Sequence, residues 1–372
     1  MKKLKLATIV GTRPELIRLS VIINKCDQFF EHSLIHTGQN YDFELNEIFF
    51  KELNIRKPDH FLEVAGNNLG ETLGNVISKS YSLFLDIKPD ALLVLGDTNS
   101  ALSILSAKRL KIPIFHMEAG NRCFDQNVPE EINRKVADHL SDINLTYTEN
   151  SRRYLLAEGF RKDFIFTIGS PLKEVLQTYA KSIGRSNVLN KLKIDPTKYI
   201  VASIHREENL DIKDNFKSII EGINKVSEQY NLPVIFSTHP RTRKKIDSLN
   251  IKMNSIQFIK PLGFFDYVHL QSNAFVTLSD SGTISEESGI MGFPAVSVRT
   301  STERPEAVDF GSIIVGNIDP NSILNATEIA IKTFSEQHLE IPNEYHAENV
   351  STRIIKVIQG YTSIVNREIW KK

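Results

Sequence analysis

The chain has 372 residues, which is too long for one ordinary hydrophobic core and predicts two domains. Lysine plus arginine equals aspartate plus glutamate at 45 each, so no global charge favours binding to nucleic acid or to a membrane surface. The two cysteines, Cys26 and Cys123, are not spaced as metal ligands and suit a reducing cytosol. No apolar run approaches the ~20 residues of a membrane span, so we expect a cytoplasmic protein.

The first half of the chain alternates short apolar runs with helical patterns. The apolar runs predict buried parallel strands that end in polar turns, at residues 4–10, 34–39, 91–98, 112–120, 143–147 and 165–171. Apolar periodicity predicts helices between them, at residues 70–85, 99–110, 131–140 and 151–158. Pro14 would lie near the first position of a further helix after the first strand. This alternation predicts a Rossmann-like domain.

The second half repeats the alternation after a charged, helical linker at residues 171–197. Strands are predicted at residues 199–204, 233–237, 256–259, 273–278, 295–298 and 313–315, and helices at residues 214–230 and 263–271. We therefore expect an α/β fold with two Rossmann-like domains, residues 1–170 and 171–355, whose parallel sheets face a central cleft. A C-terminal helical segment, residues 356–372, would pack back toward the N-terminal domain.

A strand, tight turn and helix start at residues 273–287 form the most informative local pattern. Backbone N–H groups at a helix start lack helical partners and suit a phosphate. Ser281 can add a hydroxyl donor, Gly282 allows close backbone approach, and Glu287 could accept from the hydroxyls of a ribose. The alternative is an ordinary helix cap at Asp280 or Ser281.

Charged residues also stand at predicted strand ends in the first half. Arg13 and Arg18 follow the first strand, either as ligand contacts or as solvated surface arginines. Asp97 and Glu118 follow later strands, and Glu130 opens a helix. Asp97 would also suit the cap of its following helix, whereas glutamate is a poor cap. Three acids converging on one rim are typical of acid–base chemistry.

A series of short motifs stands in order along the chain, from the first strand to the last. They are Gly-Thr-Arg-Pro-Glu at 11–15, Gly-Asp-Thr at 96–98, His-Met-Glu-Ala-Gly at 116–120, Pro-Glu-Glu-Ile-Asn-Arg at 129–134, His-Arg at 205–206, Asp-Ser-Gly at 280–282 and Glu-Arg-Pro-Glu at 303–306. With these motifs the sequence resembles the non-hydrolysing UDP-N-acetylglucosamine 2-epimerases, which have the two-domain GT-B fold. The resemblance extends from residue 4 to about residue 360.

The resemblance implies a UDP-sugar substrate, no cofactor, no metal and a homodimer. The residues it places on UDP are Arg13, His205, Ser281, Gly282, Glu287 and Arg304, with Glu287 on the ribose and the backbone of Tyr267 at the uracil. It assigns catalysis to Asp97, Glu118 and Glu130, together with His205 near the phosphates. Further substrate contacts are expected from Arg18, Arg134, Arg206 and Thr283.

Several residues depart from the usual pattern of this family. Arg18 replaces the common lysine, Thr283 replaces a second glycine and Ser285 replaces a glutamine. Cys123 lies in an altered loop at 121–125, and Glu207 stands where a second arginine is usual. These departures resemble the branch that makes UDP-N-acetyl-L-fucosamine from its L-talo 2-epimer, with interconversion of UDP-N-acetylglucosamine and UDP-N-acetylmannosamine as the alternative. Residues 39–42 depart from the segment near an activating substrate site, so allosteric activation is not expected.

The implied chemistry explains why several acids and cations are needed. No carbonyl acidifies the hydrogen on carbon 2 of such a sugar, but departure of UDP would place positive charge on carbon 1 and acidify it. Loss of the proton gives a 2-acetamidoglycal, and re-addition of UDP and a proton on the opposite face gives the epimer. The alternatives are a GT-B glycosyltransferase, a hydrolysing epimerase and an inactive UDP-sugar-binding protein.

Overall fold

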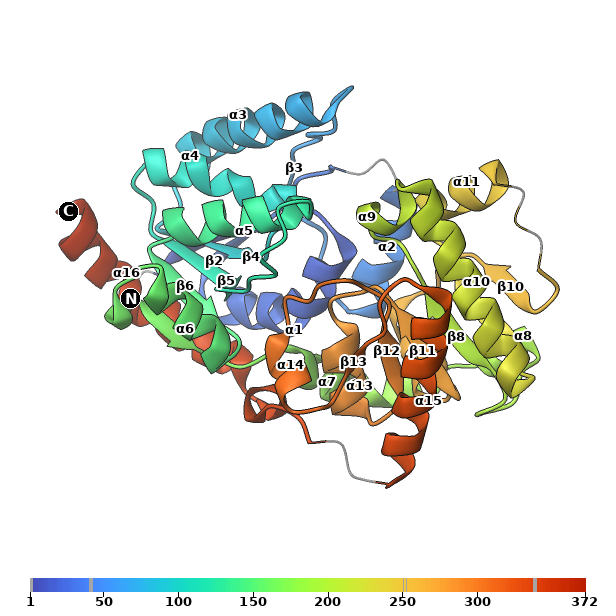
Figure 1. Cartoon of the computed structure of the whole chain (residues 1–372). Coiled ribbons are helices and arrows are strands. Elements are labelled where there is room, and N and C mark those ends of the chain that lie inside the picture. Colours follow the sequence, from blue (N-terminus) through green and yellow to red (C-terminus); the bar gives the residue numbers. More distant parts are fainter. Residues whose placement is uncertain (1–2, 40–42, 250, 252, 337–339) are drawn as a thin grey trace. The chain divides into compact units, whose positions relative to one another are not determined.

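The computed structural model describes residues 3–39, 43–249, 251, 253–336 and 340–372 (Figure 1). The chain divides into two compact units, Met1–Thr178 with Glu344–Lys372, and Tyr179–Asn343. Each unit is built on a parallel sheet, so the expected α/β fold with two parallel-sheet domains is confirmed. None of the described helices is long and apolar enough to cross a membrane.

The first unit contains a sheet with the strand order β3-β2-β1-β4-β5-β6-β7 among its described residues. All neighbouring strands are parallel. The chain first builds outward from β1 in one direction and then resumes beside β1 at β4, and ligands of open α/β sheets bind at such a reversal. The strands are β1 (Lys5–Val10), β2 (Glu31–His36), β3 (His60–Phe61), β4 (Ala91–Leu95), β5 (Ile114–Ala119), β6 (Ile143–Thr146) and β7 (Ile165–Thr167).

Helices cover both faces of this sheet (Figure 1). On one face α3, α4 and α5 bury apolar side chains against β1 and β4, while α1 and α16 lie side by side on the other face. The helical segments are α1 (Arg13–Phe29), α2 (Phe43–Glu52), α3 (Leu69–Ile87), the 3-10 turn η1 (Asn99–Ser103), α4 (Ile104–Arg109), α5 (Pro129–Leu140), α6 (Glu149–Ala157), the 3-10 turn η2 (Lys162–Phe164), α7 (Leu172–Gly184), α16 (Val350–Val365) and the π turn η4 (Asn366–Trp370).

The end of the chain belongs to the first unit over a longer stretch than the sequence analysis expected. Residues 344–355 were expected in the second domain, and residues 171–178 in the linker, but both segments lie in the first unit. The Ser170 N–H donates to the Glu344 carbonyl at 3.0 Å, and the Ser351 N–H donates to the Glu174 carboxylate at 2.8 Å. These bonds join the start of α7 to the returning chain, at Glu344 and in the first turn of α16.

The second unit contains a parallel sheet with the order β10-β9-β8-β11-β12-β13 among its described residues. One core packs α10 and α15 on this sheet, and another packs α8 and α12. The strands are β8 (Ile200–Ser203), β9 (Val234–Ser237), β10 (Ile256–Ile259), β11 (Val276–Ser279), β12 (Ala295–Ser297) and β13 (Ile314–Val315). The helical segments are α8 (Val188–Leu192), α9 (Glu207–Leu210), α10 (Lys213–Tyr230), α11 (Pro240–Ser248), α12 (Phe264–Ser272), α13 (Ile284–Met291), α14 (Pro305–Asp309), α15 (Pro320–Glu336) and the 3-10 turn η3 (Asn343–His346), which joins the units.

Candidate active site

Asp97 follows β4 and forms an ion pair instead of capping the next helical segment. Arg134 of α5 donates to Asp97 Oδ2 from Nε at 3.1 Å and from NH2 at 2.6 Å. The Asp97 side chain keeps 22% of its surface exposed, whereas that of Arg134 keeps 2%. Thr98 occupies the cap position of η1 without a side-chain cap bond. The alternative in which Asp97 caps the next helical segment is therefore wrong. Instead, the buried Arg134 holds the Asp97 carboxylate at the carboxyl end of β4.

Glu118 lies at the end of the neighbouring strand β5, where the register of pairing with β6 shifts. Its φ of 64° is unusual for a residue with a side chain, so the backbone at this position is constrained. Arg18 of α1 lies 2.6 Å from Glu118 Oε2, and both side chains are largely buried. Arg18 also lies over the Tyr147 ring, 5.5 Å from its centre. Arg18 is thus not a solvated surface arginine, because it holds the second candidate acid.

The two acids leave adjacent strand ends. Leu95 of β4 is opposite Met117 of β5. Asp97 follows Leu95 by two residues, and Glu118 follows Met117 directly. Gly96 has a φ of 69°, and a Cβ at this position would lie 3.3 Å from Glu118 Oε2. Glycine therefore meets both requirements here, a left-handed backbone and space for a carboxylate.

The acid pair at the start of α5 divides into two environments. Glu130 is half-buried in the first turn, which leaves it partly accessible. Glu131 is fully buried and accepts from the Cys123 N–H at 3.1 Å and from the Phe124 N–H at 3.3 Å. Burial alone would raise the pKa of Glu131, but the Cys123 N–H and Arg134 hold it below its usual value. Glu131 thus orders the loop before α5.

The turn between β1 and α1 is organised by a buried acid that the sequence analysis did not identify. Glu15 accepts from the Gly11 N–H at 3.0 Å and the Thr12 hydroxyl at 2.8 Å, and it also accepts from the Ser100 hydroxyl of η1. Burial raises the pKa of Glu15, although these bonds oppose the rise. Arg13 begins α1 beside this turn, and its guanidinium lies over the Phe49 ring at 5.8 Å.

A buried carboxylate also organises the corresponding strand ends of the second unit. Asp280, directly after β11, accepts from the His205 N–H at 3.1 Å, the Arg206 N–H at 2.9 Å and Asn209 Nδ2 at 3.0 Å. Asp280 Oδ1 lies 3.2 Å from Nδ1 of His205, whose side chain is 43% exposed. The alternative in which Asp280 caps the following helix is therefore wrong. Asp280 instead fixes the loop that carries His205 and Arg206.

The turn after Asp280 leads into α13, which begins at Ile284 with Thr283 at the cap position. The Ser281 and Thr283 hydroxyls are 2.9 Å apart, and the Thr283 hydroxyl donates to Glu287 Oε1 at 2.7 Å. Gln271 Nε2 donates to the other oxygen of Glu287 at 3.0 Å. The turn hydroxyls and the expected ribose-binding carboxylate thus form one connected group.

Gly282 is in contact with a second set of charges. Arg206 NH2 donates to Glu303 Oε1 at 3.0 Å, and Arg299 NH1 lies 2.7 Å from Glu303 Oε2. A Cβ at Gly282 would clash with the Glu303 carboxylate. Only glycine therefore lets the turn approach this charged cluster without a shift of its neighbours.

Arg304 and Tyr267 are both close to carboxylates of α13. Arg304 is buried and its NH2 lies 2.9 Å from Glu286 of α13, so it fixes the helix from inside the unit. Tyr267 of α12 has a raised pKa, first through burial and then through the negative charge of Glu287. Its phenol therefore stays protonated beside Glu287.

The residues expected at the site fall into one cluster in each unit. The first cluster contains Asp97, Arg134, Glu118 and Arg18, and the second contains His205, Arg206, Ser281, Gly282, Thr283, Glu287, Tyr267 and Arg304. Arg13 is the first residue of α1, and Glu130 lies in the first turn of α5. Among the described residues, no group of three or more His, Cys, Asp or Glu side chains is arranged to hold a metal ion.

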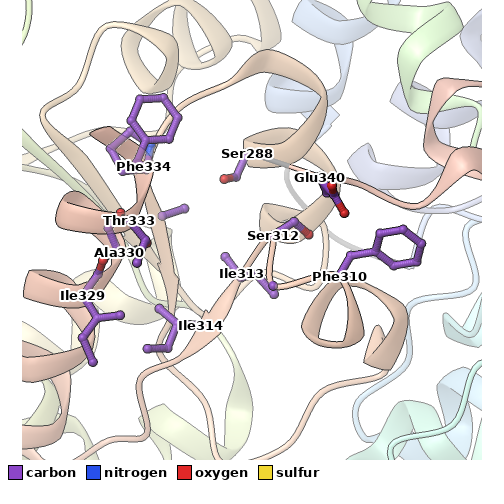
Figure 2. Close-up of a pocket in the computed structure, with 13 residues that line it drawn as sticks. Ser288, Phe310, Ser312, Ile313, Ile314, Ile329, Ala330, Thr333, Phe334 and Glu340 are labelled. Carbon is purple, nitrogen blue, oxygen red and sulfur yellow. Dashed lines mark hydrogen bonds between the residues drawn. The ribbon is translucent and has the colours of Figure 1, made fainter. Parts of the chain in front are cut away.

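A pocket of about 750 Å³ lies elsewhere in the second unit, at the edge strand β13 (Figure 2). Figure 2 shows Ile329, Ala330 and Thr333 of α15 on one side and Phe310 with Glu340 on the other. The Ser312 hydroxyl donates to the Ala307 carbonyl of α14 at 3.0 Å. None of the residues expected to bind UDP lines this pocket.

Comparison with known proteins gives a consistent result across most of the chain. A family model described as UDP-N-acetylglucosamine 2-epimerase matches residues 24–359. A solved UDP-N-acetylglucosamine 2-epimerase from Rickettsia bellii is 45% identical, with a TM-score of 0.91 and complete coverage of both chains. The Methanocaldococcus jannaschii UDP-GlcNAc 2-epimerase, solved in complex with UDP-GlcNAc and UDP, is 34% identical with a TM-score of 0.90, covering 96% of this chain and 99% of that chain. UDP-2,3-diacetamido-2,3-dideoxy-D-glucuronate 2-epimerase from Pseudomonas aeruginosa is 35% identical, covering 84% of this chain and 88% of that protein.

Proposed function

The chain belongs to the non-hydrolysing UDP-N-acetylglucosamine 2-epimerase family, and we propose that it inverts carbon 2 of a UDP-linked 2-acetamido sugar. The observation that carries this proposal is the pair of acids Asp97 and Glu118 at adjacent strand ends, each held by a buried arginine. An inversion needs groups that remove a proton on one face of carbon 2 and return one on the other. Two separate, fixed carboxylates meet that need.

The second unit would bind UDP and stabilise it as it leaves. The exposed His205 side chain, the Arg206 loop and the turn at 281–283 offer cationic and hydroxyl donors to a diphosphate. Glu287, fixed by Thr283 and Gln271, would accept from the ribose hydroxyls. The Methanocaldococcus jannaschii relative was solved with UDP-GlcNAc and UDP, which supports a UDP-sugar ligand here.

The reaction would proceed by elimination and re-addition. The bond between carbon 1 and the diphosphate oxygen breaks, and its electron pair leaves with UDP. A carboxylate takes the proton from carbon 2, and the electrons of that C–H bond form the double bond of a 2-acetamidoglycal. Return of a proton to the opposite face and of UDP to carbon 1 gives the epimer. Asp97, Glu118 and Glu130 are the candidate proton carriers.

The finer proposal concerns the sugar. Three of the unusual residues contact residues of the two clusters. Arg18 pairs with Glu118, Arg134 NH1 lies 3.9 Å from the Cys123 sulfur, and Thr283 bonds to Glu287. We propose that these changes fit UDP-2-acetamido-2,6-dideoxy-L-talose and its product UDP-N-acetyl-L-fucosamine, for surface polysaccharide synthesis. Such sugars carry a methyl group where UDP-N-acetylglucosamine carries a hydroxymethyl group.

Interconversion of UDP-N-acetylglucosamine and UDP-N-acetylmannosamine is the second candidate. It is favoured by the name of the Rickettsia bellii relative, which is 45% identical over the whole chain. The diacetamido-glucuronate 2-epimerase, at 35% identity, is about as identical to this chain as the Methanocaldococcus jannaschii enzyme at 34%, but it carries the name of a different UDP-sugar. Overall similarity therefore does not decide between the sugars, and the residues beside the acids carry the distinction.

One assay tests both levels of the proposal. Each UDP-sugar is incubated with the protein at equal concentration in D2O, and the anomeric and carbon 2 signals are followed by NMR. Epimerisation with deuterium at carbon 2 of the product is the expected result, with the L-sugar turned over much faster. Transfer to an acceptor, or release of free sugar with UDP, would overturn the proposed reaction. Efficient turnover of UDP-N-acetylglucosamine with the L-sugar inert would overturn only the finer proposal.

Two other expectations stay predictions. The homodimer implied by the resemblance can be tested by sedimentation of the purified protein. The segment expected to lack an activating site includes residues 40–42, which lie outside the described residues. Titration of initial rate against substrate concentration would detect activation as a sigmoidal curve.

A further inference from the structure

A buried histidine contacts the backbone beside the candidate acids. His116 of β5 has no exposed surface, and its Nε2 lies 2.8 Å from the Gly96 carbonyl oxygen. A carbonyl oxygen can only accept, so Nε2 carries a proton. Nδ1 lies 3.0 Å from Asp138 Oδ1, in ion-pair contact but without hydrogen-bond geometry, and the nearby negative charge favours the protonated ring. Burial alone would lower the pKa of His116, but Asp138 and the Gly96 carbonyl raise it above its usual value.

Asp138 of α5 connects this histidine to an arginine. The fully buried carboxylate accepts from Arg122 NH1 at 2.6 Å and from the Gly120 N–H at 3.2 Å. Arg122 in turn donates to Glu158 from Nε and NH2, each at 2.7 Å. With His116 protonated, two cations would alternate with two anions, an arrangement that compensates charges that would be costly to bury alone.

The backbone groups held by this network flank the acids. Gly96 directly precedes Asp97, and Gly120 follows Glu118 by two residues. His116 holds the carbonyl of the first glycine, and Asp138 holds the N–H of the second. Arg122 NH1 also donates to the Asn121 carbonyl at 2.7 Å, which extends the hold along the loop after Glu118.

We propose that His116, Asp138 and Arg122 are positioning residues, and that their buried charges set the geometry in which Asp97 and Glu118 exchange protons with carbon 2. The inference rests on the proposed function of those two acids. None of the three residues needs to touch the sugar, because each acts through the backbone on either side of an acid. Proton transfer requires a carboxylate within hydrogen-bond reach of the reacting carbon, and a misplacement of 1 Å can cost about a hundredfold in rate.

The main test is Asp138→Asn, with Asp142→Asn as its matched control. The asparagine keeps an acceptor for the Gly120 N–H but cannot balance both His116 and Arg122. We expect kcat to fall about 10- to 100-fold, while KM and UDP affinity stay within about twofold. Asp142 is also buried and holds the same strand, through the Ile114 N–H at 2.9 Å, but at the end away from the acids. Its variant should lose thermal stability and keep kcat.

A merely structural role predicts a different result. Asp138→Asn would then lower the melting temperature as Asp142→Asn does, with kcat per folded molecule unchanged, and that outcome would overturn the proposal. If Asp138→Asn does not fold, the pair His116→Gln and His116→Asn replaces it. Glutamine can still donate to Gly96 and asparagine to Asp138, so each should lose part of kcat. Full kcat in both variants would contradict the proposal.

A spectroscopic measurement checks the charge on His116 independently. In protein labelled with 15N-histidine, both ring nitrogens of His116 should show imidazolium shifts at pH 7.5, assigned by their absence in His116→Gln. Neutral imidazole shifts would overturn the proposal. Failure of the proposed function is distinguishable, because Asp97→Asn would then keep full turnover. An inactive Asp97→Asn beside a fully active Asp138→Asn would leave the function and remove the positioning role.

Discussion

The two units organise their candidate site residues with opposite charges. In the first unit the candidate proton carriers are carboxylates, and buried arginines hold two of them, as Arg134 holds Asp97 and Arg18 holds Glu118. In the second unit the groups offered to a diphosphate are N–H donors and cations, and buried carboxylates hold them. Asp280 fixes the His205 loop, and Glu303 fixes Arg206.

This difference shows that the partly exposed groups Asp97 and His205 are each held by a buried, charged partner, an arginine in the first unit and a carboxylate in the second. A buried partner fixes the geometry of a displayed group, and removing either one leaves an uncompensated charge. Changes to the displayed groups of the first unit should therefore alter turnover, and changes in the second unit should alter UDP affinity. A first-unit variant that changes UDP affinity instead of turnover, or a second-unit variant that changes turnover instead of UDP affinity, would contradict this comparison.

The largest effect is expected from Asp97→Asn and Glu118→Gln. Each variant keeps the shape of the side chain but removes the group that carries a proton, so turnover should fall by about a hundredfold or more. UDP affinity, measured by calorimetry, should stay close to that of the wild type because the second unit is unchanged. Retained activity per folded molecule with a much lower melting temperature would show that these acids only stabilise the fold.

The next effect concerns the turn of the second unit, through Gly282→Ala. The added Cβ would displace the Glu303 carboxylate from its place beside Arg206. Overpacking of this kind costs about 1–3 kcal/mol, which corresponds to about five- to 150-fold in the Kd of UDP. Gly360→Ala in α16, where a Cβ would meet no atom within 4 Å, is the control and should leave the Kd unchanged. Wild-type affinity in Gly282→Ala would remove the turn from the UDP site.

Local patterns in the sequence predicted most of the sheet framework. The apolar runs before Gly11, Gly96 and Gly120 form β1, β4 and β5, because buried parallel strands need continuous apolar runs. Pro14 does lie in the first turn of α1. The ends of these strands were also predictable, because polar residues and glycine interrupt each apolar run.

Other features depended on contacts between distant residues. Asp280 was expected as a possible cap of α13, but it holds a loop 75 residues earlier in the chain. Glu15 bonds to Ser100, 85 residues away, which a local pattern does not reveal. The sequence analysis did not predict the helix α15, although its start carries a recognisable local signal. Asp319 accepts from the Asn321 and Ser322 N–H groups, and Pro320 is the first residue of the helix.

A smaller effect should appear in the pH dependence of stability in the first unit. Burial lowers the pKa of His36 to about 4, and its Nδ1 accepts from the Gly38 N–H at 3.0 Å. Between the unfolded pKa near 6.5 and the folded value, the unfolded chain binds a proton that the folded protein excludes. Stability is therefore full above about pH 6.5 and falls as the pH decreases, by about 1 kcal/mol between pH 7.5 and 5.5.

His36→Asn is the variant that isolates this effect. Its side-chain carbonyl can still accept from Gly38, but it does not titrate in this range. Urea unfolding of the wild type and the variant at both pH values should show a smaller decrease for the variant. Equal decreases in the two proteins would mean that His36 does not carry the pH dependence.

The smallest effect is expected from Arg18→Lys, which restores the residue usual in the family beside Glu118. Arginine fixes the carboxylate at 2.6 Å and lies over Tyr147, whereas lysine offers one flexible ammonium and loses the planar stacking. We expect activity to persist, with the ratio of kcat/KM for UDP-N-acetylglucosamine to that for the L-sugar rising by about two- to fivefold. Arg161→Lys is the matched control, because Arg161 also pairs with an acid, Asp163, and lies over a ring, Phe164, but is exposed. An equal ratio in Arg18→Lys, Arg161→Lys and the wild type would show that Arg18 does not discriminate between the substrates. Its role would then be limited to pairing with the charge of Glu118.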